Sequence, residues 1–125
     1  MAAFLTDNAL DNGVQYLTTN GGALYICRAQ PTTYAEATST YALGNKNAPT
    51  VGSPQNGASS GRRVVISAIT DGSITSTDTA THWALVKITA TTELLAAQAL
   101  TSSQAVTTGN TFTTDAISIT IPDPA

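Results

Sequence analysis

The hydrophobic positions of residues 1–22 follow a helical period. Leu10, Val14 and Leu17 fall at i, i+4 and i+7, and Thr6 or Asp7 is placed to cap a helix before them. An Asn-Gly-Gly sequence then supplies a stop signal. We expect a helix of about three turns that depends on packing for its stability, because a helix this short is marginal in isolation.

A strand, a helical turn and a long polar segment are predicted over residues 23–61. The segment from Ala23 to Arg28 reads as a strand, and Thr33 and Glu36 have the spacing of a capping box that opens one or two helical turns. The segment from Gly44 to Gly61 is rich in Asn, Gly, Ser and Pro, and its prolines disfavour ladder structure. We expect a long loop there, and loops of this length in compact domains are usually functional or mobile.

From Arg62 onward the pattern predicts strands joined by tight turns. Arg63 to Ile69 is β-rich, and Asp71-Gly72 has hairpin-turn chemistry that leads into a return strand from Ser73 to Thr77. Further strands are expected at residues 80–88, 94–100, 104–107 and 112–121, with turns at 91–93 and 109–110.

The strand pattern predicts the fold class. Within residues 117–121, isoleucines alternate with Ser and Thr, which is the period-2 pattern of a strand with one buried face. Several short strands at close spacing predict a mainly β fold, an antiparallel β-sandwich, jelly-roll-like domain or small barrel with a short N-terminal helix. We expect a single domain, 1–125, comprising an N-terminal helical segment (1–22), a strand plus long loop (23–61) and a β-rich body (62–125).

The composition favours strands and a weakly charged surface. Charged residues make up 10% of the chain, against roughly 25% in typical soluble domains, while Ser and Thr supply roughly a quarter. Thr is β-branched, and the helix-forming residues Glu, Lys and Arg are scarce. A net charge of −3 gives no electrostatic footprint for a phosphate backbone, so we expect no nucleic acid partner. The start has no secretory-signal pattern and no run approaches about 18 apolar residues, so we expect no membrane partner.

His82 and Trp83, the single histidine and the single tryptophan, are adjacent within residues 80–88. Both faces of this segment carry apolar residues, which suits a central strand whose imidazole reaches a carbonyl or a Thr hydroxyl and whose indole packs under a loop. We therefore expect the pair to be structural. The alternatives are a binding role and a catalytic set in which Asp78 or Asp71 orients His82 as general base for a Ser or Thr nucleophile. The sequence has no Gly-x-Ser-x-Gly elbow.

The remaining motifs predict no catalytic, cofactor-binding or metal-binding residues, and no cofactor. The glycine-rich stretch at 57–62 lacks the Lys-Ser/Thr ending of a phosphate loop and leads into a strand. One histidine and one cysteine do not build a zinc site, and no Asp-x-Asp-x-Asp-Gly calcium loop is present. Cys27 is expected to be a small buried apolar residue. Arg62-Arg63 is expected to be a solvated strand entrance or to meet a carboxylate of a partner subunit.

Six stretches of the chain carry a resemblance to a known class of protein. They are residues 4–13, residues 26–38, Pro-Thr-Val-Gly-Ser-Pro at 49–54, Ser-Gly-Arg-Arg-Val at 60–64, Thr-Ala-Thr-His-Trp-Ala-Leu at 79–85 and Ala-Val-Thr-Thr-Gly-Asn-Thr-Phe at 105–112. Together they resemble small virion structural proteins of tailed bacteriophages, of the head decoration or minor capsid type. The resemblance spans nearly the whole chain and contains no catalytic motif.

The resemblance implies a non-enzymatic particle component, and we expect a capsid decoration or cement protein on the outer head shell. Its implied partners are the major capsid protein and copies of itself, with a trimer favoured, and its implied location is the virion, after synthesis in the host cytoplasm. The N-terminal helix or the loop from Gly44 to Gly61 is expected to make the contact. The alternative is a tail component such as a fibre, receptor-binding tip or tail adaptor. For a receptor-binding tip, Trp83 exposed beside tyrosines in a shallow groove would indicate glycan binding.

Overall fold

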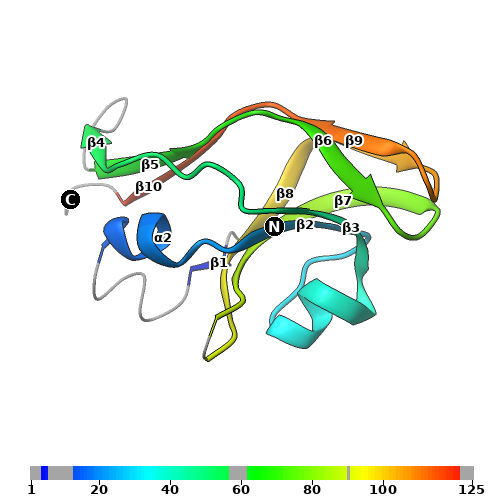
Figure 1. The fold of residues 1–125 in the computed structure, drawn as a ribbon, viewed down its shortest axis with the longest axis horizontal. Coiled ribbons are helices and arrows are strands. Elements are labelled where there is room, and N and C mark those ends of the chain that lie inside the picture. Colours follow the sequence, from blue (N-terminus) through cyan, green and yellow to red (C-terminus); the bar gives the residue numbers. More distant parts are fainter. Residues whose placement is uncertain (1–3, 6–12, 57–61, 90, 122–125) are drawn as a thin grey trace.

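Figure 1 shows the fold in a computed structural model that describes residues 4–5, 13–56, 62–89 and 91–121. Most of these residues lie in antiparallel strands, and a short helix lies near the N-terminus, so the expected mainly β fold is confirmed. The expected cap residues Thr6 and Asp7 and most of the glycine-rich stretch, residues 57–61, lie outside the described residues.

The described strands form two antiparallel sheets. Sheet A contains, in spatial order, β1 (Phe4–Leu5), β8 (Glu93–Val106), β7 (Asp78–Lys87), β2 (Ala23–Cys27), β3 (Ala42–Asn47), β6 (Ile69–Ile74) and β9 (Thr111–Thr114). Sheet B contains, in spatial order, β10 (Ile117–Ile121), β5 (Arg62–Ile66) and β4 (Gln55–Asn56).

Sheet A curls, so that β6 and β9 lie across the core from β7 and β8 (Figure 1). Because β5 is followed by β6 and β9 by β10, the β5–β10 pair of sheet B continues the β6–β9 pair as one upper layer. Apolar side chains of both layers meet in the main core, since each half-buried sheet must pack against another layer. Its fully buried members include Leu17, Leu24, Ile26, Val64, Ile66, Leu85 and Leu95.

The short helix α2 (Gln15–Asn20) packs on this core. Its Leu17 is fully buried, and the Tyr16 hydroxyl donates a hydrogen bond to Glu93 Oε1 at 2.9 Å. The Thr18 hydroxyl donates to the Gly52 carbonyl oxygen at 2.7 Å. These contacts tie the helix to the start of β8 and to the segment before β4.

The ends of α2 correct one expectation and confirm another. A continuous helix of three turns is wrong, because Gly13 takes a left-handed φ of 67° and the helix begins only after it. The expected stop is confirmed: Gly21 N donates to the Leu17 carbonyl oxygen at 2.9 Å, directly after Asn20.

A second apolar cluster lies on the opposite face of β2 and β7. A π-helical turn, η1 (Glu36–Thr40), packs there with Ala37 fully buried. The expected capping interaction is present, since the Thr33 hydroxyl accepts from Glu36 N at 3.1 Å. The Glu36 carboxylate accepts in return from the backbone N–H of Thr32 at 2.8 Å, one residue earlier than a capping box would have it.

The expected long loop from Gly44 to Gly61 is wrong at 44–47 and 55–56, while residues 48–54 between them lie outside the strands. Residues 44–47 belong to β3, which pairs with β2 on one side and β6 on the other, and two further residues form β4. Glycine fits at position 44 because the backbone of β6 passes very close: a Cβ there would lie 2.1 Å from the Ser73 carbonyl oxygen. The glycine that suggested a loop therefore marks a close approach of two backbones.

The expected hairpin turn at Asp71-Gly72 is also wrong, because both residues lie inside β6. The ladder between β6 and β9 shifts register between Ile69 and Gly72. A Cβ on Gly72 would lie 2.1 Å from the ring of Phe112, so the glycine makes room for that aromatic side chain. The expected return strand from Ser73 to Thr77 is likewise wrong, since the chain turns after Ile74.

The later strands agree with the pattern except in how they are joined. The separate strands expected at 94–100 and 104–107 are one irregular strand, β8. The single strand expected at 112–121 is two, because the chain leaves sheet A after β9 and enters sheet B as β10. The turn at 109–110 is confirmed: Gly109 has φ 90°, and the N–H of residue 110 donates to the Thr107 carbonyl oxygen at 3.0 Å.

Candidate functional site

His82 lies inside β7, which β8 and β2 flank within sheet A. The residue is 5% exposed, and its Nδ1 lies 2.8 Å from the Thr81 hydroxyl oxygen. Its neighbours across the two ladders are Cys27 and Ala99. The expected central strand and the expected contact with a Thr hydroxyl are therefore confirmed.

The two aspartates considered as partners of His82 make other interactions. Asp71 Oδ2 forms an ion pair with Lys46 Nζ at 3.0 Å, on the surface formed by β3 and β6. Asp78 Oδ1 accepts from the backbone N–H of Thr79 at 2.7 Å. Neither carboxylate orients the imidazole.

Burial lowers the pKa of His82 below the ordinary value of a histidine, because the charged ring would lose its hydration inside the sheet. The unfolded chain then binds a proton that the folded chain resists. Stability is therefore complete above the unfolded pKa of about 6.5 and declines as the pH falls from there toward the lower folded value.

We predict that the free energy of unfolding falls between about pH 7.5 and about pH 5.5 and that the slope flattens in His82→Gln. The reason is that His82 is the only histidine, while carboxyl groups titrate at lower pH. Urea unfolding at several pH values measures the slope. An equal slope in both proteins would show that another group titrates.

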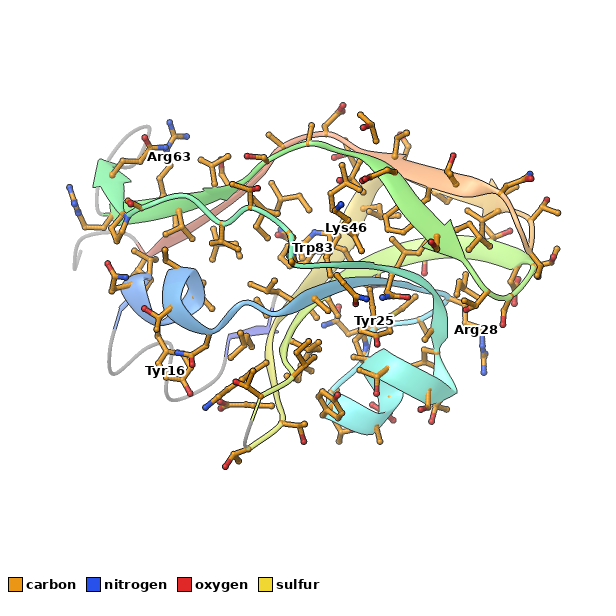
Figure 2. The ribbon with its side chains drawn as sticks, viewed as in Figure 1. Tyr16, Tyr25, Arg28, Lys46, Arg63 and Trp83 are labelled. Atoms are coloured by element: carbon orange, nitrogen blue, oxygen red, sulfur yellow. The ribbon has the colours of Figure 1, made fainter. Side chains whose placement is uncertain are left out.

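Trp83 packs in the main core between the two layers (Figure 2). It is 4% exposed, and its ladder partners are Ile26 and Gln98. Trp83 also lines the floor of a groove of about 370 Å³, which no described tyrosine lines. An exposed tryptophan flanked by tyrosines is therefore not what the structure contains.

The groove runs between β8 and the junction of β9 with β10. An irregularity in β8 forms one wall, because the ladder with β7 passes from the Ala80–Gln104 pair to the His82–Ala99 pair and leaves residues 100–103 without a partner in β7. Such bulges redirect side chains and commonly lie beside functional sites. The side chains of the opposite wall come from residues 114–118, where the chain passes from sheet A to sheet B.

A hydrogen bond joins the two walls: Gln104 Nε2 donates to the Thr113 carbonyl oxygen at 3.0 Å. Polar side chains at the walls include Gln98, Thr101, Ser102, Asp115 and Ser118. Among the described residues, the lining contains one carboxylate and no Lys, Arg or His. The groove therefore offers hydrogen-bonding groups with little charge.

Thr114 lines the same groove and is only 9% exposed. Its hydroxyl oxygen is buried and has no hydrogen-bond partner among the described residues. Buried hydroxyls nearly always have a partner, since leaving one unpaired costs about 1–3 kcal/mol. Thr114 is thus an unsatisfied polar group at the edge of a polar groove.

Cys27 and the two arginines complete the residues that the sequence singled out. Cys27 is fully buried, as expected, and burial raises the pKa of its thiol to about 12. Arg62 is exposed at the start of β5 and donates to the Pro54 carbonyl oxygen at 3.3 Å. Arg63 lies at the upper surface of sheet B (Figure 2), and its buried Nε has no partner among the described residues.

The groove was not predicted from the sequence. Its walls come from a strand irregularity and a change of sheet, which arise from strand pairing far apart along the chain. The nearest local signal was the dense run of Thr, Ser and Gln at residues 98–104. That run alone did not distinguish a binding wall from an exposed strand.

Comparison with models of protein families, with curated proteins and with solved structures finds no match to the chain. Among the described residues, no group of three or more His, Cys, Asp or Glu side chains is arranged to hold a metal ion. None of the described helices has both the length and the apolar character needed to cross a membrane.

Proposed function

We propose that the protein is a non-enzymatic structural component of a tailed-bacteriophage virion, a decoration or cement protein bound to the outer head shell. Its partners would be the major capsid protein and further copies of itself, with a trimer favoured. The support from sequence is the resemblance of six stretches to small virion proteins. The support from structure is a hydroxyl-rich end of the molecule, where Asp78 is the adjacent charged residue.

This hydroxyl tip, as we name it, comprises Thr75, Ser76, Thr77, Thr107, Thr108 and Thr111, all exposed. It lies where the β6–β7 turn meets the β8–β9 turn, at the right of Figure 1. The Thr77 and Thr108 hydroxyl oxygens are 3.1 Å apart, and Thr108 N donates to Thr77 Oγ1 at 2.9 Å. The two turns therefore form one ordered surface.

The hydroxyl tip is the observation that carries the proposal. Burying a hydroxyl against a partner costs far less than burying an unpaired charge, and hydroxyls satisfy each other as donors and acceptors. A protein held in many copies on a symmetric shell gains overall affinity from repetition, so each contact can be modest. The tip replaces the segment from Gly44 to Gly61 as the proposed contact, because that segment is partly strand.

The test is a pair of charge substitutions at the tip. Ser76→Lys with Thr111→Lys is expected to weaken binding to purified particles by about tenfold or more, because each buried ammonium would lack a partner. Ser67→Lys, exposed between β5 and β6, is the matched control and should bind normally. Quantitative occupancy on particles stripped of the protein measures both. Equal binding by all variants would remove the tip from the contact.

Localisation by electron microscopy and heat challenge test the role itself. The protein is expected on the outer head shell, and particles lacking it should lose resistance to heat and osmotic shock. Unchanged resistance would contradict a cement role. Loss of a hydrolytic activity in His82→Gln would contradict the non-enzymatic assignment.

A tail component, such as a fibre, receptor-binding tip or tail adaptor, is the second candidate. The observation that favours it is the polar groove along β8, which is built like a ligand site and which a shell contact does not need. Labelling of the tail and not the head in the same microscopy experiment would select it.

A further inference from the structure

We propose that the groove between β8 and the β9–β10 junction binds a neutral carbohydrate, and that it does so without cleaving it. Sugar binding is tested separately from the head or tail location, although the same groove is the observation that favours the tail candidate. It stands on three features of the groove: its charge, its hydrogen-bonding groups and the buried hydroxyl of Thr114.

The charge of the lining disfavours anionic ligands. No Lys, Arg or His occurs among the described residues that line the groove, while Asp115 contributes a carboxylate. Phosphates, sulfates and acidic sugars would meet repulsion without a compensating cation. A neutral ligand with many hydroxyls meets no such penalty, because each hydroxyl both donates and accepts.

The polar groups are suited to several hydroxyls at once. The exposed Gln98 offers two amide donors and one acceptor, and the Asp115 carboxylate accepts only. Gln104 uses one N–H of its side chain on the Thr113 carbonyl, which holds its amide in place and leaves its own oxygen as an acceptor. The bulged residues 100–103 add backbone groups that do not pair with β7.

Thr114 supplies the independent indication of a ligand. This residue is nine-tenths buried and borders the groove. Its hydroxyl has no partner among the described residues. Because this oxygen is closed off from solvent, a ligand hydroxyl would satisfy it only if the groove wall moved aside. Trp83 beneath gives the groove an apolar floor, but its burial means that it does not act as an exposed stacking platform.

An extended peptide is the less suitable occupant. Adding a strand to a sheet requires a regular edge with evenly spaced backbone groups. At the groove the ladder between β8 and β7 is interrupted over residues 100–103, and bulges of this kind turn a strand away from regular pairing. Over the part of its lining that the structure describes, the groove also lacks the two flanking carboxylates of most glycoside hydrolases, because Asp115 is the one carboxylate there. The ligand is therefore bound and not hydrolysed.

The single tryptophan makes the test direct, because Trp83 lines the groove and is the only indole in the chain. Trp fluorescence and backbone NMR shifts are recorded while glucose, galactose, mannose, N-acetylglucosamine and their short neutral oligomers are added. At least one of them is expected to shift the NMR signals of residues 98–104 and 114–118 together. Sulfated forms of the same sugar should bind at least about tenfold more weakly.

Two substitutions and a matched control locate the site. Gln98→Ala and Asp115→Ala are expected to weaken sugar binding by about tenfold each, since each removes one or two hydrogen bonds. Gln55→Ala, the same exposed side chain on β4, should bind as the parent does. The proposal would be overturned if no sugar of the panel binds, or if both groove variants bind sugar as tightly as the parent does. It would also be overturned if sulfated sugars bind more tightly, or if an extended peptide occupies the groove.

The result for sugar binding can be distinguished from the result for particle binding, which tests the proposed function. The groove variants should occupy phage particles normally, and the hydroxyl tip variants should bind sugar normally. Loss of both properties in one variant would be checked by its unfolding curve. If that variant is folded, joint loss would contradict the independence of the two surfaces and overturn the assignment of the sugar to the groove alone.

Discussion

Replacing Trp83 with alanine is expected to lower the free energy of unfolding by about 4 kcal/mol. Trp83 is 4% exposed in the main core, and its neighbours in the adjacent strands are Ile26 and Gln98. Alanine would leave a cavity between two layers that are both held by strand ladders, so the surroundings relax only in part. Domains of this size have a total stability of about 5–15 kcal/mol, so the variant should be close to unfolding.

Urea unfolding measures this loss, and Ile88→Ala is the matched control. Ile88 follows the same strand and is 44% exposed, so its truncation removes apolar atoms that are largely in water already. The control should lose less than about 1 kcal/mol. A Trp83→Ala variant that loses no more than Ile88→Ala would show that the indole is not part of the packed core.

Replacing Gly44 with alanine is expected to cost about 3 kcal/mol, a large effect for the addition of one methyl group. The added Cβ would lie 2.1 Å from the Ser73 carbonyl oxygen and 3.1 Å from the Ile74 Cα. Both atoms belong to the backbone of β6, which β3 and β9 hold in place, so neither can move aside as a flexible side chain would. The ladder between β3 and β6 must open to admit the methyl group.

Gly52→Ala provides the matched control for Gly44→Ala, because it makes the same chemical change at a roomy position. A Cβ on Gly52 would meet only the Val65 carbonyl oxygen at 3.4 Å, which is an ordinary contact. Its effect on the free energy of unfolding should lie within about 0.5 kcal/mol of zero. Similar losses in both variants would show that the tight approach of β3 and β6 does not limit stability.

The correct expectations came from segments whose local pattern and final environment agree. Residues 80–88 carry apolar groups on both faces, and β7 is indeed flanked by two strands and contacts an apolar cluster on each face. Cys27 was expected to be buried and is. In these segments the residue types alone indicate which positions are buried, so no knowledge of the neighbouring strand was needed.

Two of the wrong expectations came from glycines that each contact a strand distant in the sequence. Gly44 and Gly72 were read as loop and turn signals, because glycine lacks β propensity and favours turns. In the structure, one admits the backbone of Ser73 and the other the ring of Phe112. Neither partner is near in sequence to the glycine it touches, so a local pattern does not reveal it.

The sequence by itself determined the mainly antiparallel β architecture, the buried faces of most strands, and a surface poor in charge. The tertiary structure alone decided which strands pair, where β8 bulges, and that β9 and β10 belong to different sheets. The groove and the hydroxyl tip follow from those decisions, since each joins segments that are separated along the chain. The physical reason is that side-chain alternation is a local property, whereas the choice of ladder partner depends on packing between distant residues.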